Sequence, residues 1–64
     1  MLKIVKVSKD CHSVLRGNKF LCCIIETESG ARLEYMGELV SYSQLYTSEV
    51  KQILDYMLGL EDNQ

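Results

Sequence analysis

One histidine and three cysteines are the side chains of this 64-residue chain best suited to covalent or metal chemistry. They form two adjacent pairs, Cys11-His12 and Cys22-Cys23. A thiol beside an imidazole can act as a nucleophile, but it needs a third group to orient the histidine and a site for the oxyanion. Neither is evident, and the chain has no phosphate-binding glycine loop and no nucleophile elbow. We therefore predict a protein that is not an enzyme and has no catalytic residues.

The same four residues provide the right atoms for a tetrahedral zinc site. Adjacent side chains of a strand point to opposite faces, however, so Cys22 and Cys23 do not easily converge on one ion. Zinc sites separate paired cysteines by two to four residues, and no such spacing occurs here. Three cysteines without framework spacing indicate reduced thiols, with a disulfide from Cys11 to a neighbour as the alternative. We expect no metal and no cofactor.

The elements that position these side chains belong to a single domain, residues 1–64, near the lower size limit for an independent core. A hydrophobic fraction of 47% is typical of a folded chain. Domains of this size usually gain stability from a metal, from disulfides or from oligomerisation. No apolar stretch approaches the ~20 residues of a membrane span, and the sequence begins without a signal-peptide pattern. We expect a cytoplasmic protein that does not contact membranes.

Four segments have the composition and alternation of β-strands, namely residues 2–7, 12–16, 19–27 and 32–36. Polar or glycine-containing pairs separate them and favour tight turns at Lys9-Asp10, Gly17-Asn18 and Ser29-Gly30. A short helix over residues 8–16 is the alternative for the second segment.

The end of the chain has the spacing of an amphipathic helix, with one apolar face formed by Val50, Ile53, Leu54, Met57 and Leu58. Thr47 or Ser48 is suited to the N-cap and Gly59 to the C-cap. The predicted fold class is therefore α+β: a small antiparallel β-meander of three to four strands, followed by one C-terminal amphipathic helix packed on one sheet face.

Residues 20–25 are six consecutive apolar residues, so both faces of their strand are apolar. One helix covers one face, and a second copy or another protein is expected to cover the other. The predicted hairpins pair Leu15 with Phe20, Ser13 with Cys22, His12 with Cys23, Ile24 with Tyr35 and Glu26 with Leu33. The face expected beneath the helix comprises Leu15, Phe20, Cys22, Ile24, Leu33 and Tyr35. The opposite face comprises Val14, Leu21, Cys23, Ile25 and Met36, with a rim of His12, Arg16, Lys19, Arg32 and Glu34.

An apolar strip within a charged rim is typical of protein-binding surfaces. The predicted partner-binding residues are Val14, Leu21, Cys23, Ile25, Met36, Arg16, Lys19 and Arg32. We predict a non-enzymatic protein–protein interaction module: a homodimeric regulator or inhibitor that masks the surface of a partner, such as a host protein, as phage and mobile-element proteins do. The alternative is that the first strand and residues 40–45 fold over the strip.

Charge favours a second function, single-stranded nucleic-acid binding. Residues 1–20 contain one aspartate and five basic residues, Lys3, Lys6, Lys9, Arg16 and Lys19, which are suited to phosphate contacts. Tyr42 or Tyr46 is suited to stacking on bases. The net charge of −2 and the pI of 5.2 oppose this function, because nucleic-acid-binding domains are usually basic. We keep it as the alternative.

Overall fold

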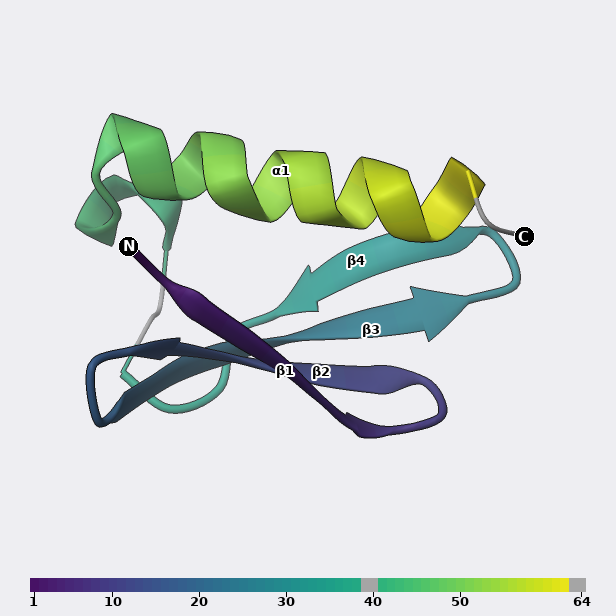
Figure 1. Cartoon of the computed structure of the whole chain (residues 1–64), viewed down its shortest axis with the longest axis horizontal. Helices are drawn as coiled ribbons and strands as arrows, with labels where there is room; N and C mark the ends of the chain where they lie inside the picture. Colours follow the sequence, from purple (N-terminus) through teal and green to yellow (C-terminus); the bar gives the residue numbers. More distant parts are fainter. Residues whose placement is uncertain (39–40, 63–64) are drawn as a thin grey trace.

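The computed structural model describes residues 1–38 and 41–62. Four strands form one antiparallel sheet in the order β1-β2-β3-β4, and a single α-helix follows (Figure 1). The elements are β1 (Lys3–Ser8), β2 (Cys11–Arg16), β3 (Lys19–Thr27), β4 (Gly30–Glu34), the 3-10 turn η1 (Tyr42–Gln44) and α1 (Thr47–Asp62). The predicted α+β meander with one C-terminal helix is confirmed, and the alternative helix over residues 8–16 is wrong.

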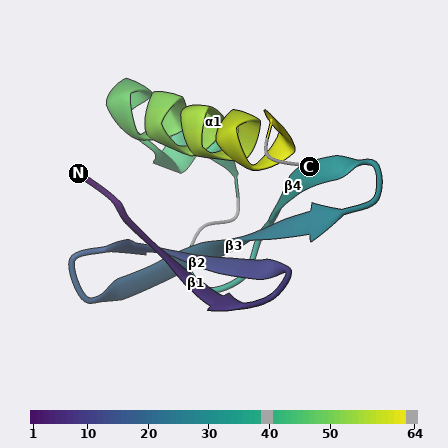
Figure 2. The ribbon, with the colours of Figure 1, turned by 45° about the vertical axis from the view of Figure 1, so that its right-hand side comes forward.

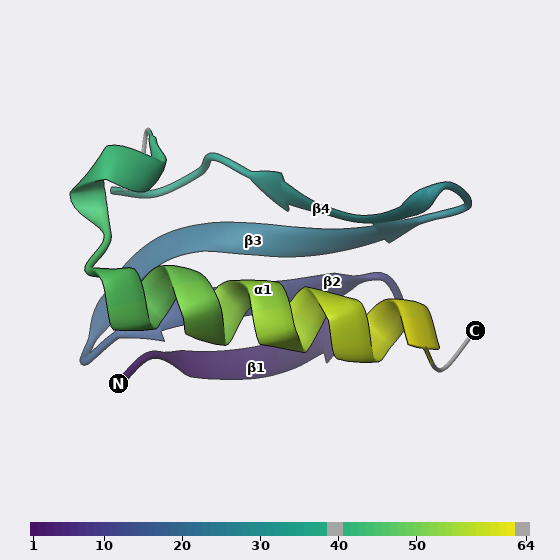
Figure 3. The same cartoon turned by 90° about the horizontal axis from the view of Figure 1, so that it is seen from above.

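The molecule has two layers. The helix α1 runs lengthwise along one face of the twisted sheet (Figures 1 and 2). From above, it lies over the middle of the sheet, with β1 along one margin and β4 along the other (Figure 3). We refer to the sheet face beneath α1 as the inner face and to the opposite one as the outer face.

The last hairpin turns two residues away from the predicted register. Thr27 pairs with Gly30, so the turn is at Glu28-Ser29, and Gly30 has a φ of 124° that favours glycine. Ile24 consequently pairs with Leu33 and not with Tyr35, and Glu26 pairs with Ala31 and not with Leu33. Because side chains alternate with a period of two, a shift of two residues leaves every side chain of β4 on its predicted face.

The hairpin between β2 and β3 contains a β-bulge that the sequence does not reveal. Leu15 pairs with Phe20 as predicted, but Val14 pairs with Cys22, so Leu21 is an extra residue in β3. Two residues of a bulged strand oppose one on its partner, so the alternation of faces is interrupted there. Ser13 therefore pairs with Cys23 and His12 with Ile24, and the predicted pairs Ser13–Cys22 and His12–Cys23 are wrong.

The core lies between α1 and the inner face. Its most deeply buried apolar side chains are Leu2, Val14, Leu21, Cys22, Ile24 and Ile53. Around them pack Ile4, Ala31, Leu33, Leu45, Tyr56, Met57 and Leu60. Burial of one such Leu, Ile or Val side chain contributes about 1.5–3 kcal/mol, so this cluster holds the helix on the sheet.

The helix is rotated and longer than the sequence pattern indicates. Leu54 and Leu58 are exposed, and Tyr56 and Leu60 replace them on the core side. The first turn is closed by Tyr46, whose carbonyl accepts hydrogen bonds from the N–H groups of Glu49 and Val50. The helix continues past Gly59 to Asp62, so Gly59 is not its C-cap. Within residues 1–38 and 41–62, no helix is long and apolar enough to span a membrane.

Candidate functional site

The outer face carries a strip of apolar side chains over which the described residues place no helix. Because side chains alternate along each strand, the register assigns the outer face without ambiguity. Its cross-strand rows are Lys3-Leu15-Phe20, Val5-Ser13-Cys23-Glu34 and Cys11-Ile25-Arg32. We refer to its main apolar residues, Val5, Leu15, Phe20, Cys23 and Ile25, as the outer strip.

The outer strip remains accessible to solvent. Val5 is 37% exposed and Phe20 36%, while Leu15 and Ile25 are half-buried. Burial of this apolar surface by a second molecule would contribute a free energy of roughly 25 cal/mol per Å². A contiguous strip of this kind is a surface that a second molecule can cover.

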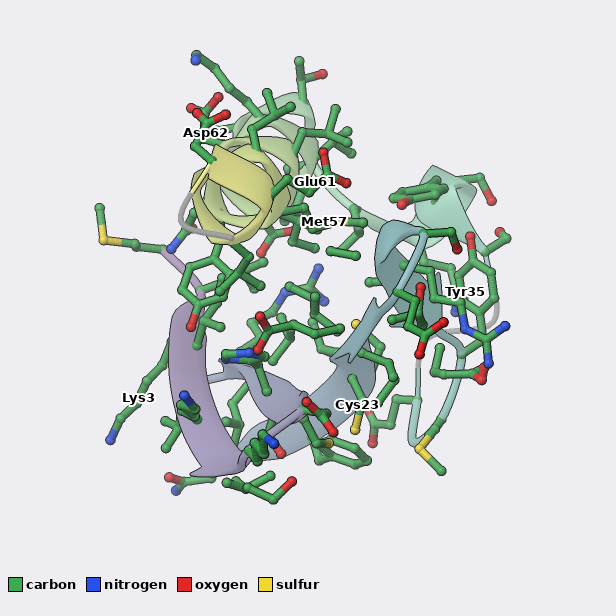
Figure 4. All side chains as sticks on the ribbon, turned by 90° about the vertical axis from the view of Figure 1, so that its right-hand side faces the viewer. Lys3, Cys23, Tyr35, Met57, Glu61 and Asp62 are labelled. Carbon is green, nitrogen blue, oxygen red and sulfur yellow. The ribbon has the colours of Figure 1, made fainter. Side chains whose placement is uncertain are left out.

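Cys23 is the most buried residue of the outer strip, because its neighbours on the same face enclose it. It lies on the side of the sheet away from α1 (Figure 4). Burial and then a hydrogen bond with the thiol of Cys11 raise the pKa of the Cys23 thiol, and the hydroxyl of Ser13 opposes them. Cys23 is therefore a protonated, largely apolar group at neutral pH.

Residues 35–38 border the strip at the start of β3, beside Phe20. The N–H of Glu38 donates to the carbonyl of Phe20 at 3.2 Å. Gly37 has a φ of 76°, and a Cβ atom built there would lie 2.5 Å from the same carbonyl oxygen. Only glycine fits this close approach. The side chains of Tyr35 and Met36 are exposed, and the ring of Tyr35 lies edge-on to that of Tyr42, with 6.0 Å between their centroids.

Charged groups of both signs surround the strip. Arg32 and Glu34 form an ion pair of 2.8 Å on β4. At the opposite margin, the exposed side chain of Lys3 points away from the sheet (Figure 4). The outer face therefore has an isolated positive charge on one margin and an acidic group within a pair on the other.

Six of the eight predicted interaction residues divide into two groups. Cys23, Ile25 and Arg32 lie on the outer face, and Met36 is exposed beside it. Val14 and Leu21 are 0% and 3% exposed in the core, so their assignment to the outer face is wrong. The bulge is the physical reason, because it turns Leu21 and Val14 towards α1 together with Cys22.

The bulge also explains the residues that the sequence analysis missed. Leu15 and Phe20 were expected beneath the helix and instead lie on the outer face. In a strand where apolar and polar residues alternate, an extra residue breaks the alternation and so reveals a bulge. Residues 20–25 are all apolar, so their sequence has no alternation that could be broken. Tyr35, also expected beneath the helix, is exposed.

The alternative cover for the strip is wrong for the described residues. The first strand is an edge strand of the sheet and does not fold over it. Residues 41–45 lie on the helix side, where Leu45 packs against the core cluster (Figure 1). Val40 lies outside the described residues.

A chain of hydrogen bonds crosses the inner face from β3 through β2 to α1. His12 is 1% exposed, with Nε2 2.9 Å from Oε2 of Glu26 and Nδ1 2.8 Å from the hydroxyl oxygen of Tyr56. An ionised carboxylate only accepts hydrogen bonds, so Nε2–H donates to Glu26. In the neutral imidazole, Nδ1 is then an acceptor for the hydroxyl of Tyr56. Both ring nitrogens of this buried side chain are satisfied.

This arrangement supplies the orienting group that the sequence analysis did not find. Glu26 fixes the tautomer of His12, as a carboxylate does in nucleophilic triads. The base faces Tyr56 and not a cysteine, however, because the bulge places His12 and Cys23 on opposite faces. The imidazole is also enclosed by protein. What the geometry provides is a polar link that fixes the rotation of α1 against β2 and β3.

A second polar link holds the start of α1 to the end of β2. Nε of Arg16 donates to Oε2 of Glu49 at 3.0 Å, and Nη2 donates to Oε1 at 2.6 Å. The N–H of Tyr46 donates to Oε1 of Glu49 at 2.9 Å. The hydrogen bonds from Arg16 lower the pKa of the Glu49 carboxyl, against the effect of its burial. Arg16 therefore lies on the inner side and not in the predicted rim.

The five basic residues proposed for nucleic acid do not form one surface. Arg16 is engaged with Glu49, and Nζ of Lys19 lies 4.0 Å from Glu38 at the turn end of β3. Lys3 and Lys6 share β1 but occupy opposite faces, because their cross-strand partners are Leu15 and His12. Lys9 is in the following turn.

No group of three or more histidine, cysteine or acidic side chains among residues 1–38 and 41–62 is arranged to hold a metal ion. The three cysteines are free thiols. Comparisons with models of protein families, with curated proteins and with solved structures found no match for this chain.

Proposed function

We propose that this protein is a non-enzymatic interaction module whose outer strip binds a second copy of the chain. The observation that carries the proposal is the exposure of Val5 and Phe20 on a sheet whose other face is sealed by α1. A domain of 64 residues has little core to spare, and oligomerisation is a common source of added stability at this size.

Charge favours a second copy as the occupant. Two sheets that stack face to face about a two-fold axis parallel to their strands place β1 of one copy over β4 of the other. Lys3 of each copy then lies near Glu34 of the other, and the apolar residues meet between them. A standard interface of about 800 Å² per partner is roughly a fifth of the 4404 Å² surface of the monomer.

The biological role that we propose is steric. A dimer of this kind acts by covering a surface of another protein, which places it among regulators and inhibitors. This role rests on the small size of the chain, because the dimer buries its apolar strip.

The test is the molar mass in solution, measured by light scattering and sedimentation from about 1 µM to about 300 µM protein. We expect a dimer for the natural sequence and a monomer for Val5→Asp and Ile25→Asp. Leu58→Asp is the matched control, since Leu58 is 57% exposed on the helix and outside the strip. Circular dichroism checks that each variant is folded. A monomeric natural protein over the whole range, or dimers that persist in the folded strip variants, would overturn the proposal.

A further inference from the structure

The two edge strands of the sheet differ in how their outward backbone groups are satisfied. On β4, the outward N–H of Ala31 donates to Oε1 of Glu61 at 3.2 Å, so the end of the helix occupies one outward group within this strand. Figure 4 shows Glu61 on the side of α1 that faces β4. A helix side chain that occupies an edge group opposes further strand pairing at that point.

On the β1 side, the helix side chain bonds only the backbone of Leu2, the residue directly before the strand. The N–H of Leu2 donates to Oε1 of Gln52 at 3.0 Å, and Nε2 of Gln52 donates to the carbonyl of Leu2 at 2.7 Å. The side-chain amide of Gln52 thus pairs with Leu2 as a neighbouring strand would. Both backbone groups of Leu2 therefore point away from β2.

This direction determines the rest of the edge. Along a strand, alternate residues direct their N–H and C=O groups to the same side. Ile4 and Lys6 consequently direct theirs outward, as Leu2 does, and neither residue has an outward hydrogen bond to any described residue. Figure 3 shows β1 along the free margin of the sheet. The edge is open to one more strand over Ile4 and Lys6, up to the irregularity of register between Lys6 and Ser8.

The charges along this edge indicate the chemistry of that strand. Lys3 lies on the outer face, Lys6 on the inner face and Lys9 in the turn at the end of β1, and all three are exposed. None of the ion pairs found between described residues involves them. A strand that pairs with β1 has cations beside both of its faces, so acidic side chains on both faces complement it.

We propose that the β1 edge binds an extended acidic segment of another protein by strand addition. The pairing uses the backbone groups of Ile4 and Lys6 for affinity and the three lysines for selection of the segment. A second copy is a poor occupant for this edge, because two antiparallel β1 strands bring six lysines into one ribbon. The inference does not depend on the outer strip, because it concerns the margin of the sheet and not its face.

The probe is an acetylated and amidated octapeptide with the repeat Glu-Glu-Val-Val, which places glutamate on both faces of a strand. It is added to ¹⁵N-labelled full-length protein at low salt. We expect the amide signals of Ile4 and Lys6 to shift and their hydrogen exchange to slow. A peptide with a central proline, which interrupts the ladder, and one with lysine in place of glutamate are expected to bind at least several-fold more weakly. Lys6→Glu is expected to weaken the acidic peptide several-fold. Lys19→Glu, the same charge change at the far end of β3, should not.

The proposal is overturned if the amides of Ile4 and Lys6 do not respond at about 1 mM peptide. It is also overturned if the proline peptide binds equally well, since no ladder would then be involved. An oligothymidylate that shifts the same signals more strongly than the acidic peptide would assign the edge to nucleic acid. Ile25→Asp, the monomeric variant expected above that leaves β1 unchanged, is tested with the same peptide, so failure of the edge and failure of the dimer are distinguishable.

Discussion

The hydroxyl of Tyr56, in the middle of α1, lies 2.8 Å from Nδ1 of a His12 side chain that is almost completely enclosed. The contact joins residues 44 positions apart and connects the only α-helix of the described residues to the second strand. The contact matters for the stability of the fold because it is buried. A buried polar atom without a hydrogen-bond partner lowers the free energy of unfolding.

Tyr56→Phe is expected to lower the free energy of unfolding by about 1–3 kcal/mol, because it leaves a buried ring nitrogen unpaired. Urea denaturation followed by circular dichroism measures the change. Tyr46→Phe is the matched control. Tyr46 is exposed, and its hydroxyl has no hydrogen bond to any of the described residues. Equal stabilities for the two variants would show that the Tyr56–His12 contact contributes little.

The Arg16–Glu49 pair predicts a dependence of stability on pH. Because the folded-state pKa of Glu49 lies below its ordinary value of 4.5, the pair stabilises the fold above that pH. This contribution decreases as the pH falls from 4.5 through the lower folded-state pKa. We expect Glu49→Gln to be less stable than the natural protein at pH 7 and to lose less stability on acidification.

Denaturation curves between pH 7 and pH 3 test this prediction, with Arg16→Gln and the double variant completing a thermodynamic cycle. The two single changes should not be additive, since each removes the same pair. Additive losses, or an unchanged acid slope in Glu49→Gln, would contradict the prediction.

Two glycines predict opposite effects of the same substitution. Gly37→Ala is expected to lower the free energy of unfolding by more than about 1 kcal/mol, because the new Cβ meets the Phe20 carbonyl at a positive φ. Gly59→Ala is expected to raise it by about 0.5–1 kcal/mol, because Gly59 is helical and a Cβ there meets nothing within 4 Å. Thermal and urea denaturation measure both changes. A stabilised Gly37→Ala variant would show that residues 35–38 do not approach β3 in this way.

The three thiols are expected to differ in reactivity. Burial in the core raises the pKa of Cys22 to about 11, so very little of its thiolate exists at pH 8. Cys11 is half-exposed on the outer face and should be labelled first by a disulfide reagent. Mass spectrometry after brief labelling at pH 8, with urea-unfolded protein as the control, measures the order. Comparable labelling of Cys22 and Cys11 in the folded protein would contradict the placement of Cys22.

The sequence was sufficient to predict the four strands, the helix and their order, because each has a periodic pattern or a clear turn. It was not sufficient for the faces of β2 and β3. Their assignment depends on one extra residue, Leu21, within a run that is apolar throughout and so gives no signal of a bulge. The apolar outer face was predicted correctly in kind, with Cys23 and Ile25 in place but Phe20 and Leu15 unexpected.

The polar links were beyond prediction for a different reason. The helix pattern suggested a face centred on Leu54 and Leu58, whereas Tyr56 is drawn inward by its bond to His12. A search for apolar periodicity does not detect such a bond, because tyrosine, with its apolar ring and polar hydroxyl, suits both the core and the surface. The partner of Arg16 was equally hidden, because Glu49 lies 33 residues further along the chain.

The extra residue in β3 has a consequence for how homologous chains should be compared. Removing Leu21 would leave Leu15 opposite Phe20 and Val14 opposite Cys22, so the remaining side chains would keep their faces and only one core side chain would be lost. A natural variant one codon shorter at this point would therefore present the same exterior. An alignment gap at position 21 would mark a change in the interior of the molecule, with its outer strip preserved.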